Sequence, residues 1–536
     1  MPQPKVTSMQ RTLLIGLDGA TFKVLDPLIS QGQLPHLAEL LSRGVRAELL
    51  STPHPLTPPA WTTLMTGRLP GNHGIFDFLR SEIRPGGAFF TLNDFRDIRC
   101  ETIWSIVSRA GGQITSLNFP LMAPPPKING SIVPGLLSWR HLRRNVHPPE
   151  LYDELKSLPG FSANEISWDF EHEKKAMQII ADDELESWVR FHVVREKHWF
   201  DITKHLMRNR PADLTAVMFD GVDKLQHSCW RFLDEAYLSE NPSPLEQTMR
   251  ELCLTYFREL DGFIGDLVTL AGDDARVFIA SDHGFGPTET VLRINKWLES
   301  LGHLKWQTVD DQKPKAGHFV ALDWERTIAY APSGATNGIH IRVARQPGEV
   351  GVPVEEYSQF RDRLGEQLRE LKHPKTGEPL VKEVMTFEQA YPGAEQGQAP
   401  DLTLVLFDHG FFSVLDSEPM IWQRPQVAGT HAPEGIFAAR GPGIPQGKTL
   451  PQQSILDVAA TLLYSLGLPI PEDFESRVMT DVFEADTLAA HPIQSGPATV
   501  SPGDTSTDTS NEATEEEQAD SEEKILERLR ALGYVE

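Results

Sequence analysis

The chain has 536 residues, 40% of them hydrophobic and 23% charged, which is typical of a globular protein too large for one compact core. Its formal net charge of −25 argues against a binder of nucleic-acid duplexes, because such a protein needs a basic face. Three widely spaced cysteines argue against a disulfide framework or a thiolate metal site, and no run of roughly 20 apolar residues suggests a membrane-spanning helix.

The first apolar segment, Thr12–Leu17, bears on where the protein resides. It is short, it ends at Asp18, and no small-residue cleavage site follows it, so it does not resemble a signal peptide. We therefore expect a cytoplasmic protein.

Short apolar segments that end in polar residues recur along the chain and predict buried strands. The segment Thr12–Leu17 is the first, and a helix is expected over Pro35–Arg43, with Pro near its start and Gly44 after it. Together with the segments below, this alternation predicts an α/β fold whose mostly parallel sheet is sandwiched by helices. The further strands are expected at Leu214–Phe219, Arg276–Ala280, Asp401–Phe407 and Gly435–Ala439, and the long helices at Glu184–Arg208 and Pro244–Ala271.

Two stretches depart from this alternation and are expected to be cap-like insertions, at about 79–210 and about 287–426. With them, the catalytic domain is expected to occupy residues 1–484. Residues 485–520 are rich in Ser, Thr, Pro, Gly and acidic residues, a composition that predicts a disordered linker. A short amphipathic helix is expected within 521–536.

Small clusters of Asp and His follow the predicted strands, where open α/β sheets place their ligands. Asp223 and His227 are four residues apart, so both would face one side of a helix and could share a metal ion. A single such residue is more often a turn former, but three carboxylates and three imidazoles together suit zinc or manganese. The candidate ligands are Asp18, Asp223, His227, Asp282, His283 and His431.

Thr57 precedes two prolines and a helical pattern, which is typical of a helix N-terminus, and its hydroxyl could simply cap that helix. The same position also lies at the positive end of the helix dipole, where an anion is favoured, and a nearby metal ion would promote ionisation of the hydroxyl. Thr57 is therefore the candidate nucleophile. Other nearby hydroxyls fall inside the helical run and would bond to a carbonyl one turn earlier: Thr62, Thr63 and Thr66.

Five motifs follow one another along the chain: LIGLDG, TPPAWTTLMTGRLPGNHGIFDF, FDGVDKLQH, IASDHGFG and GTHAPEGIFAARGPGI. From about Arg11 to Glu484, the chain resembles the alkaline phosphatase superfamily, most closely its type I phosphodiesterase/nucleotide pyrophosphatase branch. The resemblance implies two divalent ions, with zinc expected and manganese the alternative, and attack on phosphorus by Thr57 to form a phosphoenzyme. By position, one ion would be held by Asp18, Thr57, Asp282 and His283, and the other by Asp223, His227 and His431.

The implied substrates are phosphodiester or pyrophosphate bonds in a small phosphate ester or nucleotide. Asn72 and His73 lie near the nucleophile in sequence and are candidate substrate contacts, although they could equally form a turn. Asp220 could replace Asp223 as a ligand, but the spacing to His227 matches the family at Asp223. One position departs from the branch: Phe78 stands where its members have an Asn that helps to bind the phosphoryl oxygen, so nucleotide specificity does not follow.

Other functions share these ligands. A phosphomonoesterase or a mutase-like phosphoryl transferase would use the same metals. A sulfatase is disfavoured because the nucleophile region TPPAW has no Cys or Ser for formylglycine. A non-catalytic phosphoanion-binding protein on the same scaffold is the alternative of another class, and the complete ligand set argues against it.

Overall fold

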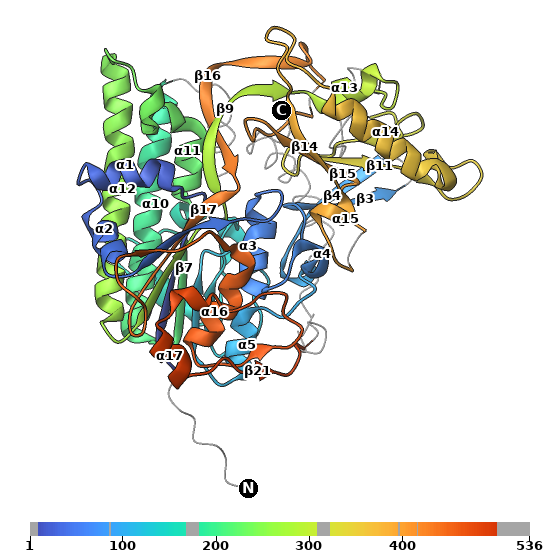
Figure 1. The fold of residues 1–536 in the computed structure, drawn as a ribbon. Helices are drawn as coiled ribbons and strands as arrows, with labels where there is room; N and C mark the ends of the chain where they lie inside the picture. Colours follow the sequence, from blue (N-terminus) through green and yellow to red (C-terminus); the bar gives the residue numbers. More distant parts are fainter. Residues whose placement is uncertain are drawn as a thin grey trace.

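The computed structural model describes residues 9–84, 87–167, 182–307, 322–394, 397–414 and 416–500. Within these ranges, nine strands form one main sheet, in the order β18-β2-β17-β8-β1-β7-β5-β6, with β19 pairing with β2. Figure 1 shows this sheet, labelled at β7 and β17, between two layers of helices. All its pairs are parallel except those of β17 with β2 and β8, so the predicted mostly parallel sheet is confirmed. The strands are β1 (Thr12–Leu17), β2 (Val45–Leu50), β5 (Ile114–Leu117), β6 (Gly130–Val133), β7 (Leu214–Phe219), β8 (Arg276–Ala280), β17 (Glu434–Arg440), β18 (Lys448–Thr449) and β19 (Gln453–Ser454).

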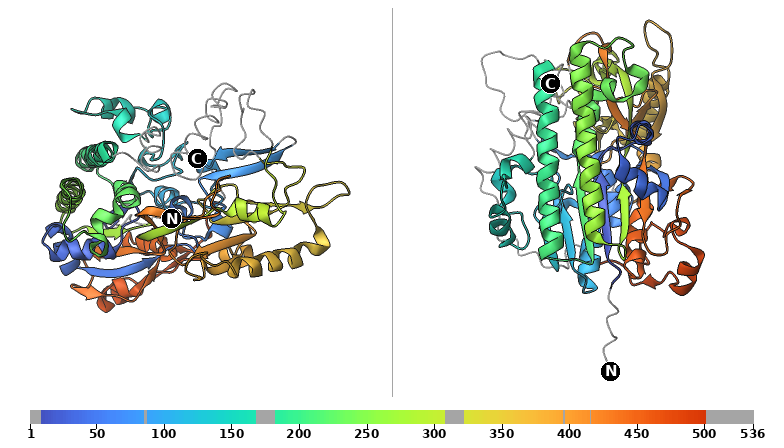
Figure 2. Two further views of the ribbon diagram at one scale, coloured as in Figure 1. Left: turned by 90° about the horizontal axis from the view of Figure 1, so that it is seen from above. Right: turned by 90° about the vertical axis from the view of Figure 1, so that its left-hand side faces the viewer.

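Each face of the sheet is covered by helices, because its central strands are apolar on both faces. Every residue of β1 is buried, and successive side chains enter opposite cores: Leu13 and Ile15 pack in one hydrophobic cluster and Leu14 in the other. Figure 2 shows α10 and α12 side by side along one face. The first core includes α2 (Pro35–Ser42), α10 (Asp182–Asn209) and α12 (Pro244–Ala271), and the second α3 (Thr57–Thr66), α5 (Ile103–Arg109) and α16 (Val458–Ser465).

A separate sheet forms within the range expected as the second insertion. In the described part of that range, β10-β11-β15-β14 make a four-stranded sheet with its own hydrophobic cluster, to which α13 and α14 contribute. An antiparallel ribbon of β9 (Gly284–Leu292) and β16 (Ile421–Ala432) joins it to the main sheet. The elements are α13 (Ile294–Ser300), β10 (Ala329–Tyr330), β11 (Gly338–Ile341), α14 (Tyr357–Arg369), β14 (Val381–Thr386) and β15 (Leu402–Leu406).

The first expected insertion, about 79–210, is too wide. It contains β5 and β6, which continue the main sheet beyond β7 through parallel pairs. Both strands have only four residues, too short for a clear hydrophobic period, so the sequence pattern did not reveal them. The long helix α10 in the same range also packs on the core rather than on a cap.

The linker expected at 485–520 does not begin where composition predicts. Residues Ala485–Ala490 form helix α17, and β21 (Ser495–Gly496) pairs with β20 (Ile470–Pro471). Further along, the backbone N–H of Thr499 donates to Asp473 over 2.8 Å. Hydrogen bonds to the catalytic domain, together with packing of Leu488 against the second core, thus order this segment. Residues 501–536, including the expected terminal helix, lie outside the described residues. No helix among the described residues is long and apolar enough to cross a membrane.

The buried carboxylate of Asp77 links the main domain to the insertion that contains the four-stranded sheet. Its Oδ2 accepts a hydrogen bond of 2.7 Å from the Ser333 hydroxyl, and its Oδ1 accepts one of 2.5 Å from the Phe78 backbone N–H. Burial raises the pKa of Asp77 to about 6 despite these donors. The native state therefore favours the protonated form more than the unfolded chain does.

Asp77→Asn should stabilise the protein at neutral pH. Because the pKa is raised on folding, the contribution of Asp77 is fully present below the unfolded pKa of 3.8 and is lost as pH rises through about 6. An amide carries no charge; its oxygen can still accept from the Phe78 N–H, and its NH2 group can donate to the Ser333 hydroxyl in place of the present bond. The free energy of unfolding should therefore rise by up to about 3 kcal/mol at pH 7.5 and hardly at pH 4. Urea denaturation of both proteins across this pH range measures the difference. The exposed Asp266→Asn is the control, and a difference independent of pH would contradict the assignment.

Candidate metal centre

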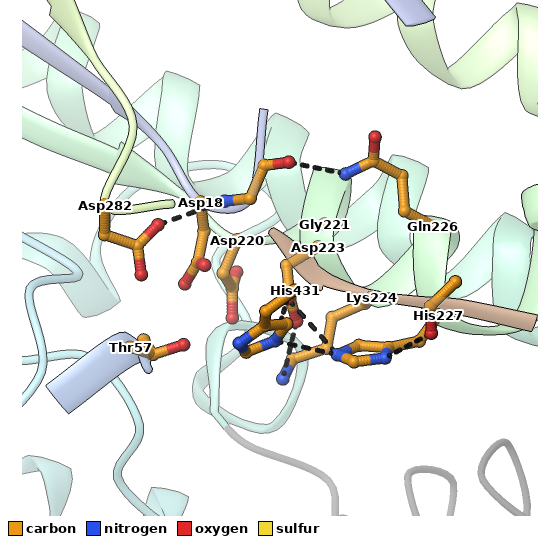
Figure 3. Close-up of polar contacts among 12 residues, drawn as sticks. Asp18, Thr57, Asp220, Gly221, Asp223, Lys224, Gln226, His227, Asp282 and His431 are labelled. Atoms are coloured by element: carbon orange, nitrogen blue, oxygen red, sulfur yellow. Dashed lines mark hydrogen bonds and ion pairs between the residues drawn. The ribbon is translucent and has the colours of Figure 1, made fainter. Parts of the chain in front are cut away.

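The sheet order brings the predicted ligands together. Strands β1, β7 and β8 are parallel neighbours, so their carboxyl ends meet at one edge of the sheet. Figure 3 shows Asp18, Asp282 and Thr57 on one side of the site, and Asp223 beside the rings of His431 and His227 on the other. The ligands come from the end of β1 (Asp18), the first two turns of α11 (Gly221–Leu233; Asp223, His227), the end of β8 (Asp282, His283) and β16 (His431).

The first group of donor atoms surrounds His283, which is fully buried. Its Nε2 lies 3.2 Å from Asp282 Oδ2 and 3.6 Å from Asp18 Oδ1. The hydroxyl of Thr57 lies 3.4 Å from the same nitrogen. This is the set that the resemblance assigned to one metal ion.

The second group surrounds Asp223. Its Oδ1 lies 3.1 Å from His431 Nε2 and 3.3 Å from His227 Nε2, and the two imidazole nitrogens are 3.1 Å apart. Donor atoms of Asp223, His227 and His431 all lie within 4.8 Å of one another, and so do those of Asp18, Asp223 and His283. The two groups are therefore adjacent and meet at Asp223.

Backbone carbonyls orient all three imidazoles in the same way. The Nδ1 atoms lie 3.0 Å from the carbonyl of Gly284 for His283, 2.8 Å from that of Pro55 for His431 and 3.3 Å from that of Gly429 for His227. A ring that donates from Nδ1 to a carbonyl has a lone pair at Nε2, which is the tautomer that binds metals. In each ring that Nε2 faces a carboxylate of the site.

Several buried oxygens of the site have no hydrogen-bond donor. Among the described residues, none donates to Asp18 Oδ1, Asp223 Oδ1 or Asp282 Oδ2. Imidazole nitrogens lie close to these oxygens, but when they carry lone pairs, both partners are acceptors. Such an arrangement is unfavourable unless a cation lies between them, and oxygen and imidazole donors suit zinc. The residues present therefore fit divalent metal ions.

The electrostatics of the metal-free cluster lead to the same conclusion. Burial, reinforced by Asp282, raises the pKa of Asp18, and burial raises the pKa of Asp282 to about 8. Burial together with His431 holds the pKa of His283 well below its usual range. Burial alone would raise the pKa of Asp223, but His227 and Lys224 bring it well below its ordinary value. Divalent ions would offset the repulsion among these carboxylates.

Asp220, the alternative to Asp223, has a different partner. Its Oδ1 accepts a hydrogen bond of 2.5 Å from the guanidinium of Arg195, and both side chains are almost fully buried. The neighbouring Glu196 accepts one of 2.5 Å from the backbone N–H of Gly221. These two α10 residues fix the start of α11, which carries two ligands. Sequence reasoning missed them because they lie mid-helix in a range assigned to an insertion.

Thr57 is the first residue of α3, and the structure excludes the alternative that it only caps this helix. The N-cap position is Leu56, and no side chain caps the helix. The Thr57 hydroxyl is therefore not used by the backbone, and it faces the first ligand group. Phe78, in place of the family's Asn, is buried in the same apolar cluster as Leu56, the residue before Thr57.

Asn72 and His73, predicted as substrate contacts, both take part in hydrogen bonds within the protein. His73 is fully buried; its Nε2 lies 3.0 Å from the Thr63 hydroxyl and its Nδ1 accepts from the backbone N–H of Ile75. Burial lowers the pKa of His73 to about 3. Asn72 accepts a hydrogen bond of 3.1 Å from the backbone N–H of Ala394. The whole of α3 separates both residues from Thr57 along the chain.

We expect the two residues to affect stability rather than substrate binding. His73→Ala leaves a cavity and an unpaired backbone N–H, so the free energy of unfolding should fall by about 2 kcal/mol or more. Asn72→Ala loses one exposed hydrogen bond and should cost less than about 1 kcal/mol. Denaturation curves and steady-state kinetics separate these effects. A large rise in KM in stable Asn72→Ala protein would restore it to the substrate site.

Comparison with known proteins agrees with the fold. The sequence model of the type I phosphodiesterase/nucleotide pyrophosphatase family matches residues 12–434. Phosphonoacetate hydrolase from Sinorhizobium meliloti 1021, solved with phosphonoformate, is 14% identical, with 86% of this chain and 95% of that chain covered and a TM-score of 0.50. An inactive murine ectonucleotide pyrophosphatase/phosphodiesterase 5 in complex with AMP is 16% identical, with 87% and 97% covered and a TM-score of 0.49. No curated protein matches the sequence. The alkaline phosphatase-like fold is confirmed.

Proposed function

Because this chain belongs to the type I phosphodiesterase/nucleotide pyrophosphatase family and is a hydrolase of phosphoester bonds, we propose that it acts through a phosphothreonine at Thr57. The proposed substrates are phosphodiester or pyrophosphate bonds in small phosphate esters or nucleotides. One observation carries the proposal: the Thr57 hydroxyl lies 3.4 Å from His283 Nε2, against a site of three buried carboxylates. A purely structural threonine would have no reason to face that site.

The two donor groups described above would hold two divalent ions, proposed to be zinc. Asp18, Asp282, His283 and Thr57 would hold one, and Asp223, His227 and His431 the other. When bound, such ions make a weak hydroxyl more acidic and neutralise negative charge on a transferring phosphoryl group. Two dications and three carboxylates leave the site positive, which suits an anionic substrate.

The residues of the chain then have distinct tasks. The Thr57 oxygen forms a bond to phosphorus while the bond from phosphorus to the leaving oxygen breaks, and the leaving group departs with a proton. Water next attacks the phosphothreonine, which releases the phosphate product and restores the hydroxyl. Thr57 begins a ten-residue helix with no side-chain cap, so backbone N–H groups and the helix dipole favour the anion there.

A phosphomonoesterase is the second candidate, because the buried, apolar Phe78 stands at the position of the family's Asn. The family's diesterase branch has a polar amide at that position, which this chain lacks. A panel of phosphomonoesters and phosphodiesters distinguishes the two by their kcat/KM values.

Thr57→Ala should retain the fold and lower turnover by roughly a thousandfold or more, because the covalent route is lost. Thr66→Ala is the matched control, since its hydroxyl donates to the carbonyl of Thr62 over 2.7 Å within the same helix. Mass spectrometry after an acid quench should find phosphate on the peptide that contains Thr57. Near-normal hydrolysis of an aryl phosphodiester by Thr57→Ala would contradict the covalent mechanism.

Removing metal with a chelator should abolish turnover, and zinc should restore it with two equivalents per chain. Asp223→Asn should lower the metal content, because its Oδ1 lies beside two imidazoles. Asp261→Asn is the control: this buried carboxylate accepts from the backbone N–H groups of His36 and Leu37 and should affect stability alone. Elemental analysis with assays gives both answers, and full activity in metal-free protein would contradict the proposal.

A further inference from the structure

One aromatic side chain, Phe285, contacts all three imidazoles of the site. It lies two residues after His283, and in the β9–β16 ribbon it pairs directly with His431. Its ring centroid is 4.8 Å from that of His227, 5.3 Å from that of His431 and 6.0 Å from that of His283. The ring is 3% exposed. It therefore forms a wall shared by ligands that come from three separate elements.

The position of the ring is itself tightly fixed. A Cβ atom added at Gly19 or at Gly429 would come within 2.9 Å of the Phe285 ring, so the backbone approaches it from two directions. On a further side, Trp230 stacks with it at 6.1 Å between centroids and an interplanar angle of 22°. A ring enclosed in this way cannot move without displacing the turn after β1, strand β16 or helix α11.

We propose that Phe285 is a positioning residue for both metal groups, so that loss of its ring weakens the binding of both ions together. The inference rests on the proposed metal-dependent function. Each imidazole is held at Nδ1 by one backbone carbonyl, and a single hydrogen bond still allows the ring to tilt about that atom. The face or edge of Phe285 restricts this tilt and directs Nε2 toward the carboxylates.

A direct contact also couples the two groups. The rings of His283 and His431, one from each group, stack at 3.7 Å with an interplanar angle of 22°. Phe285 touches both members of this stack and also His227. Removal of its ring would leave space into which all three imidazoles can turn, whereas removal of one ligand affects mainly its own group.

The test measures zinc binding by the full chain in competition with a chromophoric chelator. Phe285→Ala should raise the dissociation constants of both zinc ions, each on the order of 10- to 100-fold, while His227→Ala should weaken mainly one. Phe285→Leu, which retains more of the volume, should fall between Phe285→Ala and the native chain. Phe278→Ala is the matched control, because Phe278 is an equally buried ring of β8 that packs against Phe437 away from the ligands. With cobalt in place of zinc, the visible spectrum of Phe285→Leu should shift, and that of Phe278→Ala should not.

Two results would overturn the inference: unchanged affinity for both ions in Phe285→Ala, or a loss confined to one ion. If Phe285→Ala does not fold, the Phe285→Leu titration and cobalt spectrum decide in the same way. Failure of the proposed function looks different, because the native chain would then bind zinc without hydrolysing any phosphate ester, or bind none. A chain that binds two ions normally and loses both in Phe285→Ala supports the role of Phe285 even if no substrate is found.

Discussion

Mutual repulsion among three buried carboxylates is the constraint on which this structure depends. Asp18, Asp223 and Asp282 end or follow neighbouring strands, and each is at most 3% exposed. Ionised carboxylates are not tolerated at such burial without positive charge nearby. In the described part of the chain, one oxygen of each lacks a hydrogen-bond donor, and Lys224 pairs with Asp223 alone, so bound cations would supply the charge that stabilises the group as a whole.

The rest of the fold holds these groups against that repulsion. The apolar strands β1, β7 and β8 fix the backbone from which the carboxylates project, and cores on both faces keep the sheet rigid. Behind α11, Arg195 neutralises Asp220 and Glu196 anchors the first turn of the helix. On the imidazole side, three backbone carbonyls and the ring of Phe285 set the direction of each Nε2. The site is thus a feature of the sheet edge and its support, rather than of one loop.

Much of this could be predicted from local sequence. The long helix Pro244–Ala271 has the predicted bounds, and five of the six ligands come after predicted strands, whereas His431 lies in β16, which was not predicted. The features that the sequence did not reveal depend on contacts between residues that are far apart in the chain. Phe285 and His227 are far apart in the sequence and come into contact only in the folded protein. Arg195 of α10 likewise pairs with Asp220 at the start of α11. The short strands β5 and β6 are recognisable only by their place beside β7. His73 lies near Thr57 in sequence but bonds to Thr63 in the core.

The central claim is that two metal ions occupy the adjacent donor groups, and crystallography with anomalous scattering at the zinc edge tests it most directly. Crystals of the zinc-loaded chain should show two anomalous peaks per molecule. One should lie among Asp18, Asp282, His283 and the Thr57 hydroxyl, and the other among Asp223, His227 and His431. A single peak, or peaks away from these residues, would contradict the two-metal account.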